Sequence, residues 1–486
     1  MRTINQLYID GAFVEPHGTE RLELVNPTTE DILGHVVLAD REDALRAVAA
    51  AKRALPSFSQ TSKAERVDML KRLHAAVLSR KDALRDATVE EYGGPLSRSS
   101  WVSQYAAQSF LDAATVLETY EFEQRAGRST VVMEPVGVAL LITPWNSNAG
   151  SICSKLAMAI AAGCTTVIKP SELSAIQTQI LAEALHEAGL PPGVINILNG
   201  RGDVIGAELS THRDIARISF TGSGGTGKAI ARLAMDTMKR VTLGLGGKSP
   251  SLILDDADLA TALPAALTAA FQNSGQACIA GSRLLVPRAQ LAQVTARIKT
   301  LVEQLKVGDP ADPETVVGPM ANRSHFERVQ SYIRRGIEEG ATVLVGGPGR
   351  PDDLSRGFFV RPTVFVDVRN DMTIAQEEIF GPVLSIVAYD SEDEAVSIAN
   401  DSMFGLHAYV FSSNPARAQA VARRLQAGRV AINAMQHDPL APFGGYKQSG
   451  IGREFGVQGL ESFLEAKTIM APVHGVSSAA SPSSGE

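Results

Sequence analysis

Residues 217–227 of the 486-residue chain read Arg-Ile-Ser-Phe-Thr-Gly-Ser-Gly-Gly-Thr-Gly, a β-prone run followed by a glycine-rich turn. A helical segment at residues 228–238 follows directly. The order of strand, G-x-G-x-x-G turn and helix is typical of dinucleotide-binding α/β units, in which glycines let the backbone approach a pyrophosphate at a helix N-terminus. The acid expected about 20 residues later is missing, because residues 241–247 contain no carboxylate. A glycine-rich turn that binds nothing therefore stays an alternative at this point.

The segments on both sides of this turn alternate between short β-branched runs and longer helical patterns. Before the turn, the pattern predicts strands at residues 129–134, 138–142, 165–168 and 194–198, and helices at 40–54, 63–84, 151–162, 175–188 and 204–210. After the turn, it predicts strands at 240–243, 251–254, 282–287, 342–345 and 383–389, and helices at 259–273, 290–304, 326–340 and 391–400. Such alternation predicts an α/β fold with parallel sheets covered by helices. Two successive blocks predict two lobes with a ligand cleft between them.

The composition excludes several classes of protein. Hydrophobic residues make up 44% and charged residues 20% of the chain, which is ordinary for a globular protein with a sizeable core. The formal charge of −7 argues against nucleic acid as a partner. Residues 1–6 lack the apolar core of a signal peptide, and no apolar run reaches the ~18 residues of a membrane-spanning helix. Because Cys153, Cys164 and Cys278 form no paired framework, we expect a soluble cytoplasmic protein, with a disordered tail at 475–486.

Two further segments carry side chains that favour chemistry at the predicted cleft. Lys169 and Glu172 follow the strand at 165–168, so both project from the carboxyl edge of the sheet and could hold the hydroxyls of an adenosine ribose. The alternative is a surface ion pair beside a proline turn. Cys278 lies in a glycine-interrupted turn between a predicted helix and a predicted strand, where exposure and a lowered pKa would make it a nucleophile. The alternative for a lone cysteine is a small buried hydrophobe.

Taken together, these motifs resemble the aldehyde dehydrogenase superfamily over residues 5–467. Seven segments in the family's order carry the resemblance: Thr143–Asn146, Lys169–Glu172, Phe220–Ser223, Gly246–Pro250, Gly275–Cys278, Glu377–Val383 and Pro442–Gly450. The resemblance implies an α/β subunit with two Rossmann-like domains plus a small β arm. It implies a cofactor-binding domain at 1–117 and 136–246, a catalytic domain at 247–450 and an oligomerisation arm at 118–135 and 451–474. The arm would join subunits into a homodimer or homotetramer.

The resemblance also implies a chemistry, the NAD(P)-dependent oxidation of an aldehyde to a carboxylate. The Cys278 thiolate would attack the aldehyde carbonyl. The oxyanion would be held by the Asn146 side-chain amide and the Cys278 backbone N–H. Hydride would then pass to the nicotinamide and leave a thioester on the sulfur.

The same resemblance implies a set of residues that bind the cofactor. They are Thr143, Trp145, Lys169, Glu172, Gly222, Ser223, Leu245, Glu378 and Phe380. Ser223 would hold the pyrophosphate, Glu378 the nicotinamide ribose, and Phe380 would lie beside the nicotinamide ring. Glu172 would repel a 2′-phosphate, which favours NAD over NADP. No metal is expected.

One motif departs from the family at the position of its general base. The family usually reads Glu-Leu-Gly-Gly-Lys where residues 244–248 read Gly-Leu-Gly-Gly-Lys, and that glutamate activates water to hydrolyse the thioester. Glycine takes no proton, so we expect deacylation to slow by about 10²–10⁴-fold. Three explanations stay open: Gly244 is an engineered change, Glu454 or Glu378 acts as a substitute base, or the acyl group leaves to a nucleophile such as coenzyme A. A nucleotide-binding scaffold and a thiol esterase are alternative functions.

The residues expected around the substrate also depart from the family. Ser147 and Ser154 stand where relatives commonly carry a bulky aromatic residue and a tryptophan, so we expect a wide tunnel near the thiol. On the opposite wall, residues 433–443 include His437, which could add polar contacts, and end at Phe443, also expected to contact the substrate. A solvated loop residue is the alternative for His437. Our hypothesis is an aldehyde bulkier or more polar than a short alkyl aldehyde, aromatic or semialdehyde-like.

Overall fold

The glycine-rich turn follows a strand inside an eight-stranded sheet. The structure, a computed structural model, describes residues 1–470. The sheet has the order β20-β12-β11-β8-β9-β10-β2-β3. Its strands are β2 Leu7–Ile9, β3 Ala12–Val14, β8 Val138–Ile142, β9 Thr166–Lys169, β10 Ile195–Ile197, β11 Ile215–Thr221, β12 Arg240–Gly244 and β20 Gly450–Ile451. The strands from β12 to β10 are parallel, and the short edge strands pair antiparallel.

Helices cover both faces of this sheet. They are α1 Arg41–Phe58, α2 Lys63–Ser79, α3 Lys81–Tyr92, α4 Leu96–Thr119, α5 Asn148–Ala162, α6 Ala175–Glu187, α7 Ala207–Thr211 and α8 Gly224–Met235. Because successive side chains of a strand point to opposite faces, Leu141 of β8 joins one buried cluster and Leu140 joins the other. Helix α5 packs against both the sheet and α4, which explains why nearly all of its residues are buried.

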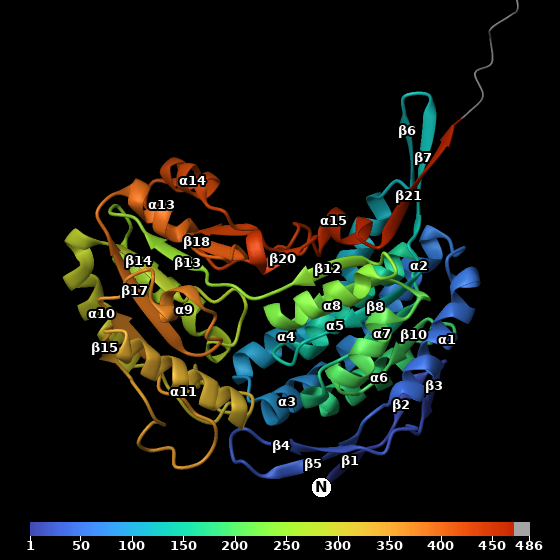
Figure 1. Ribbon diagram of the computed structural model, residues 1–486, viewed down its shortest axis with the longest axis horizontal. Helices are drawn as coiled ribbons and strands as arrows, with labels where there is room; N and C mark the ends of the chain where they lie inside the picture. The colour runs from blue at the N-terminus through green and yellow to red at the C-terminus, as the bar shows by residue number, and fades with distance from the viewer. Residues whose placement is uncertain (471–486) are drawn as a thin grey trace, which may run out of the picture.

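A seven-stranded sheet forms the second lobe. Its order is β15-β16-β17-β14-β13-β18-β19, and all of its strands but β15 pair in parallel. The strands are β13 Pro250–Ile253, β14 Arg283–Pro287, β15 Thr342–Val345, β16 Thr363–Val366, β17 Val383–Tyr389, β18 His407–Phe411 and β19 Arg429–Ile432. The helices of this part of the chain are α9 Leu259–Phe271, α10 Leu291–Glu303, α11 Arg323–Glu338, α12 Thr373–Gln376, α13 Glu392–Asn400 and α14 Pro415–Arg424. Figure 1 shows the two lobes side by side.

Two small sheets complete the described residues. One contains β1 Arg2–Ile4, β5 Ile32–Val37 and β4 Arg21–Val25. The other contains β21 Leu464–Met470, β7 Ser129–Pro135 and β6 Glu123–Ala126. Helix α15 Gly456–Glu461 precedes β21 in the chain. In Figure 1 this second sheet projects away from the first lobe as an arm. The tail predicted at 475–486 and the last predicted arm residues, 471–474, lie outside the described residues. Among the helices of residues 1–470, none is long and apolar enough to cross a membrane.

The predicted α/β fold with two lobes is confirmed, and two helix predictions need correction. The helix predicted at 63–84 is two helices, α2 and α3, broken at Arg80. The Arg80 N–H donates to the carbonyl oxygen of Val77, which tightens the last turn of α2, and its side chain pairs with Glu187 of α6. The helix predicted at 204–210 begins as a π-turn at Gly202–Gly206 and continues as α7.

Candidate active site

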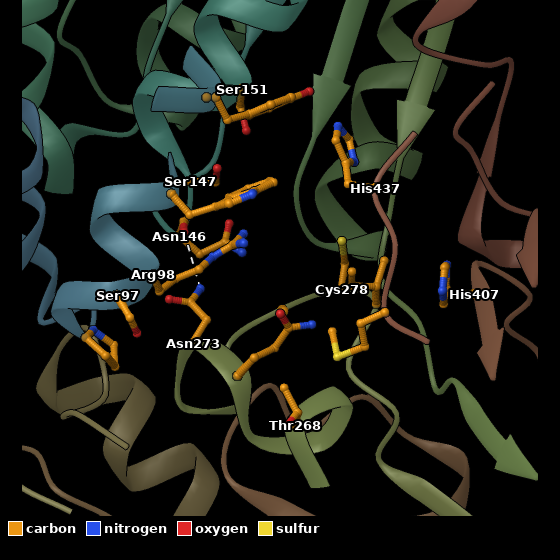
Figure 2. A pocket seen from close by; sticks show the side chains of 18 of the residues that line it. Ser97, Arg98, Asn146, Ser147, Ser151, Thr268, Asn273, Cys278, His407 and His437 are labelled. Carbon is orange, nitrogen blue, oxygen red and sulfur yellow. Dashed lines mark hydrogen bonds between the residues drawn. The ribbon is translucent and has the colours of Figure 1, made fainter. Parts of the chain in front are cut away.

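A cavity of about 610 Å³ lies between the two lobes and takes residues from both (Figure 2). In Figure 2, Arg98 and Asn146 lie on one wall, and Cys278 and His437 lie on the other. The cavity brings together these residues predicted as catalytic or substrate-binding: Cys278, Asn146, Glu454, Ser147, Ser154, His437 and Phe443. Among residues 1–470, no group of three or more His, Cys, Asp or Glu side chains could hold a metal ion.

The turn that carries Cys278 is bent by three successive residues with positive φ. Asn273, Ser274 and Gly275 follow helix α9 with φ of 54°, 58° and 71°. At Gly275 an added Cβ would lie 2.2 Å from the carbonyl oxygen of Gly381, so glycine is required. At the other two positions the conformation is costly for a residue with a side chain, which is typical of functional sites. The bend turns the chain so that the half-buried Cys278 lines the cavity.

The thiol of Cys278 is free, but its pKa moves in the direction opposite to the prediction. Burial raises the pKa of Cys278 to about 12, and the nearby carboxylates of Glu378 and Glu454 also raise it. Arg98 opposes this rise. The lowered pKa expected from an exposed turn is therefore wrong, because the lobes remove water from the sulfur and place two carboxylates near it.

The side chain of Asn146 is fixed against the turn that holds the thiol. Its Nδ2 donates to the carbonyl oxygen of Gln276 at 2.9 Å. The Asn273 side chain donates to the same carbonyl oxygen at 3.0 Å. A primary amide has two N–H donors, so Asn146 keeps one for a ligand in the cavity. The arrangement can hold a carbonyl oxygen beside Cys278.

Gly244, the position that the resemblance assigns to the general base, lies next to Glu454. Gly244 ends β12 and faces Gly450 of β20 across an antiparallel pair. The chain that leaves β20 brings Glu454 Oε1 to 3.7 Å from the place where a Cβ on Gly244 would stand. The nearest atom to that Cβ is the Thr221 hydroxyl oxygen at 3.1 Å, so a Cβ fits after a small shift of this hydroxyl. Gly244 does not have a positive φ, so its backbone does not require glycine.

Glu454 forms a buried ion pair with Lys155 of α5. The two side chains are 15% and 2% exposed, and Lys155 also donates to Ser219 Oγ at 3.0 Å. Burial lowers the pKa of Lys155, and Glu454 opposes that shift. Backbone hydrogen bonds in both directions between Glu454 and Phe443 fix the segment that carries the carboxylate. A fixed carboxylate that lines the cavity can accept a proton from water there.

Glu378, the other candidate base, lies against the glycines that connect the two lobes. Its carboxylate accepts a hydrogen bond from the Gly247 N–H at 3.1 Å. A Cβ on Gly246 would lie 2.2 Å from Glu378 Oε2, so glycine is required there. Burial raises the pKa of Glu378 to about 7. Because Glu454 lines the cavity and Glu378 does not, the geometry favours Glu454 as the substitute base.

The glycine-rich turn has the features of a phosphate-binding site. Ser223 precedes α8, and its hydroxyl oxygen caps the helix by accepting a backbone N–H at 3.3 Å. At Gly224 an added Cβ would meet nothing within 4 Å, so the start of α8 faces open space. At Gly222 and Gly227 the added Cβ would lie 2.6 and 2.5 Å from side chains, the latter that of Leu245. The turn therefore has glycines where packing is close and open space before its amides, which fits a pyrophosphate.

The other predicted cofactor residues lie at the ends of strands in the first lobe or belong to the second lobe. Lys169 ends β9, and its Nζ donates to Glu172 Oε2 at 3.0 Å. Thr143 follows β8, and its buried hydroxyl has no hydrogen-bond partner, as expected of a group that awaits a ligand. The rings of Trp145 and Phe380 approach edge to face at 5.5 Å, across the two lobes. This set fits a dinucleotide that spans the edge of the first sheet and reaches the second lobe.

Aromatic rings surround the outer part of the cavity. His437 is exposed, and the edge-to-face distances of its ring are 5.7 Å to Trp101, 4.8 Å to Tyr105 and 5.6 Å to Phe455. Phe443 lies 5.7 Å from Phe455. The small side chains of Ser147 and Ser154 line the same cavity.

Several cavity residues were not predicted from the sequence. Arg98, Trp101 and Tyr105 of α4 lie three and four residues apart, which places them on one helix face, and this spacing was the available signal. Lys155 does not line the cavity but pairs with Glu454, and it was signalled as the one charged residue of helix α5, because a lysine is seldom buried without a partner. Arg429 lines the cavity from β19 without any local pattern that marks it.

A thiol and a carboxamide that line one cavity, beside a dinucleotide-type turn in a two-lobed α/β fold, are typical of pyridine-nucleotide enzymes that use a cysteine. The comparisons with known proteins agree with this class. The profile described as the aldehyde dehydrogenase family matches residues 13–469. The chain belongs to the aldehyde dehydrogenase family.

Similar proteins of known name or structure cover almost the whole chain. The 3-succinoylsemialdehyde-pyridine dehydrogenase of a Pseudomonas species is 46% identical over 97% of this chain and 99% of its own length. A cysteine-to-alanine mutant of aldehyde dehydrogenase C from Pseudomonas syringae, solved with NAD⁺ and octanal, has a TM-score of 0.94 and 46% identity over 96% of both chains. Betaine aldehyde dehydrogenase from Staphylococcus aureus, solved with NAD⁺, has a TM-score of 0.93 and 36% identity over 96% of this chain and 94% of that chain. These findings confirm the predicted fold and enzyme class, an NAD(P)-dependent oxidoreductase that acts on aldehydes.

Proposed function

We propose that this enzyme oxidises its aldehyde through a thioester on Cys278, with NAD as the hydride acceptor. The observation that carries the proposal is the placement of Cys278 and Asn146 in one cavity. The sulfur adds to the aldehyde carbon, and the Asn146 amide and the Cys278 backbone N–H hold the oxygen, each supplying about 3 kcal/mol. Bound NAD accepts the hydride that leaves the same carbon. A thioester remains on the sulfur, and its hydrolysis gives the carboxylate.

The thiol must lose its proton as it attacks. Because the pKa of Cys278 is raised to about 12, the thiol is protonated at neutral pH. Glu378 and Glu454 are the carboxylates whose charges raise this pKa, and we assign to them the role of accepting the proton, directly or through water. The pKa of Glu378, raised to about 7, makes it a base that is half-ionised near neutrality.

Glu454 is the base that we assign to hydrolysis of the thioester. It lines the cavity, and its carboxylate lies 3.7 Å from the Cβ position of residue 244, where the family usually carries its base. The ion pair with Lys155 fixes the position of this carboxylate beside the cavity, where it would accept a proton from water. Since this carboxylate reaches the thioester from a different backbone position, we expect hydrolysis that is slower than hydride transfer.

The cofactor assignment rests on the open turn and the strand ends of the first lobe. We assign Ser223 and the start of α8 to the pyrophosphate, and Lys169 with Glu172 to the adenosine ribose. Glu378 would hold the nicotinamide ribose, and Phe380 would lie beside its ring. NAD is preferred over NADP because Glu172 would repel a 2′-phosphate, and NAD⁺ is the cofactor in the similar solved structures.

The substrate that we propose is an aldehyde larger than a short alkyl aldehyde, aromatic or semialdehyde-like. The cavity of about 610 Å³, with serines at 147 and 154, has room for such a molecule. The name of the Pseudomonas relative denotes a semialdehyde that carries a pyridine, and the Pseudomonas syringae enzyme was solved with octanal. A specificity profile in which acetaldehyde has the best kcat/KM would contradict this assignment.

We also propose an assembly and a location. The arm of β6, β7 and β21 has an exposed edge strand, β21, which suits pairing between subunits in a homodimer or homotetramer. In this assignment residues 118–135 and 451–470 form the described part of the arm, residues 1–117 and 136–246 form the cofactor-binding domain, and residues 247–450 form the catalytic domain. Unpaired cysteines favour the cytoplasm, where thiols stay reduced.

Stopped-flow absorbance of NADH tests the proposed function. Mixing enzyme, NAD and an aromatic aldehyde should give a burst stoichiometric with subunits, followed by a slow steady phase. Mass spectrometry of the trapped protein should find the acyl group on Cys278. NAD binding without a burst from any aldehyde would favour a scaffold, and ester hydrolysis without a burst would favour a thiol esterase. A steady phase accelerated by coenzyme A would show that the acyl group leaves to a thiol.

A further inference from the structure

Arg98 of α4 has donors that nothing in the described chain uses. Its side chain lies on the cavity wall opposite Cys278 and His437 (Figure 2). The Nε atom is buried and has no hydrogen-bond partner. Within residues 1–470, Arg98 makes no ion pair, and its guanidinium contacts the face of the Trp101 ring at 4.3 Å. The planar group is therefore held in place by stacking, with its N–H groups left free for a ligand.

Two other shielded arginines, Arg429 and Arg283, have acceptors in the protein for several of their N–H groups, and the buried Arg217, whose Nε also has no partner, still donates from Nη2 to Thr242 and Ser462. Arg429, which also lines the cavity, donates to the carbonyl oxygens of Pro442 at 2.9 Å and Asp438 at 2.8 Å. The fully buried Arg283 donates to several acceptors, among them the carbonyl oxygen of Lys248 at 3.0 Å. A guanidinium that is shielded from water without acceptors is costly, so its retention calls for a partner that binds there.

The acids of the cavity do not neutralise this charge. Glu454 is paired with Lys155. Glu314, at an exposed position, is paired with Lys306 at 3.0 Å. Arg98 is therefore a net positive charge on the cavity wall, in surroundings where attraction for an anion is stronger than in water.

The residues that line the cavity indicate which part of the substrate would carry the anion. Trp101, Tyr105 and Phe455 form an apolar surface on the Arg98 side, and Asn146 and Cys278 mark the reacting end. A carboxylate matches a guanidinium with two parallel hydrogen bonds, which no neutral group of the same size does as well. We propose that Arg98 is a specificity-determining residue that binds a carboxylate carried by the aldehyde substrate, so that the enzyme prefers anionic aldehydes. This inference rests on the proposed function, because it requires the aldehyde carbon to meet Cys278.

The positive charge of Arg98 could instead stabilise the Cys278 thiolate, and this role predicts a different pattern of rates. If Arg98 served only to stabilise the Cys278 thiolate, its loss would slow the oxidation of every aldehyde by the same factor. If it binds the substrate's carboxylate, its loss slows only the anionic aldehydes. The comparison of two aldehydes of equal shape therefore separates the two roles.

The test measures NADH burst rates at low aldehyde concentration for 4-carboxybenzaldehyde and 4-formylbenzamide, which differ in charge and little in shape. The aliphatic pair 5-oxopentanoate and pentanal repeats the comparison. We expect the wild type to prefer each anionic aldehyde by about tenfold or more. Arg98→Gln should slow the anionic aldehydes by about 10- to 100-fold and the neutral ones by less than about threefold. Arg98→Lys, which keeps the charge but not the two parallel donors, should fall between.

Arg297→Gln is the matched control, because it removes an equal charge from an exposed position of α10 outside the cavity. It should leave both rates unchanged. Equal losses for anionic and neutral aldehydes in Arg98→Gln, or a wild type without preference, would overturn the inference and leave the proposed function intact. A wild type that gives no NADH with any aldehyde would instead overturn the proposed function. Arg98→Lys keeps the test decisive if Arg98→Gln does not fold.

Discussion

The two sides of the cavity around Cys278 are built in different ways. On one side, Asn146 is held by a hydrogen bond of 2.9 Å to the turn that carries the thiol. On the other side, Gly244 stands where the resemblance places the general base, and Glu454 approaches from the chain that follows β20. In our proposal the first side serves the addition of the thiol to the aldehyde, and the second serves hydrolysis. The contrast indicates that the two half-reactions can be changed separately.

The largest effect is expected from Cys278→Ala, which removes the atom shared by both sides. NADH formation should fall by at least about 10⁴-fold, because no covalent intermediate forms. Stopped-flow and steady-state absorbance measure the loss, and fluorescence titration should show that NAD still binds. Cys153→Ala is the matched control, because it removes a thiol that is buried in α5 and does not line the cavity. A surviving burst in Cys278→Ala would place the thioester elsewhere.

The second-largest effect is expected from a substitution that returns a carboxylate to position 244. Gly244→Glu should raise the steady rate by about 100-fold and leave the burst unchanged, because a general base contributes about 10²–10⁴-fold. The Cβ of the new residue fits after a shift of the Thr221 hydroxyl, which lies 3.1 Å from it. Gly244→Gln has the same size and no basic group, so its steady rate should stay near the wild-type value. Equal acceleration by both variants would point to packing and not to proton transfer.

A smaller effect is expected from substitution of Glu454, the carboxylate that we assign to hydrolysis of the thioester. Glu454→Gln should slow the steady phase by about tenfold or more, with the burst amplitude retained. The substitution leaves the buried Lys155 without its partner, which can destabilise the fold. The double variant Glu454→Gln with Lys155→Met avoids that unpaired charge and should show the same slow phase. Glu314→Gln changes an exposed carboxylate of the same cavity and should leave both phases unchanged. A steady phase that Glu454→Gln does not slow would exclude Glu454 as the base.

The fold could be predicted because each of its signals is local. The strand predicted at 138–142 matches β8, and the helix predicted at 175–188 differs from α6 by one residue. In both, the pattern of apolar residues reflects which faces are buried. The strands of the first 37 residues were not predicted, because they are short and pair with distant or antiparallel partners.

The site residues that could be predicted are those that the family resemblance places, within its motifs or, as with Ser154 and His437, outside them. Cys278 and Asn146 lie in such motifs, and they line one cavity. The raised pKa of the thiol depends on burial by both lobes, which no local pattern reports. The approach of Glu454 to Gly244 depends on the pairing of β20 with β12, and Arg98 depends on which face of α4 meets the cavity. These properties arise from contacts between segments that are far apart in the sequence.

The smallest expected effect concerns the charge that the second lobe places near the thiol. A thiol reagent such as 4,4′-dithiodipyridine reacts with the thiolate, so its rate at Cys278 should rise with pH up to the pKa of about 12. Glu378, with a pKa of about 7, is ionised at pH 8.5 and raises the thiol pKa there, whereas at pH 6 its carboxyl group is mostly protonated. Glu378→Gln should therefore speed the reaction by about threefold at pH 8.5 and leave it nearly unchanged at pH 6. Glu377→Gln, which alters the exposed neighbouring carboxylate, should change neither rate. Equal acceleration at both pH values would mean that Glu378 shields the sulfur by its size, because a neutral carboxyl group has no charge to lose.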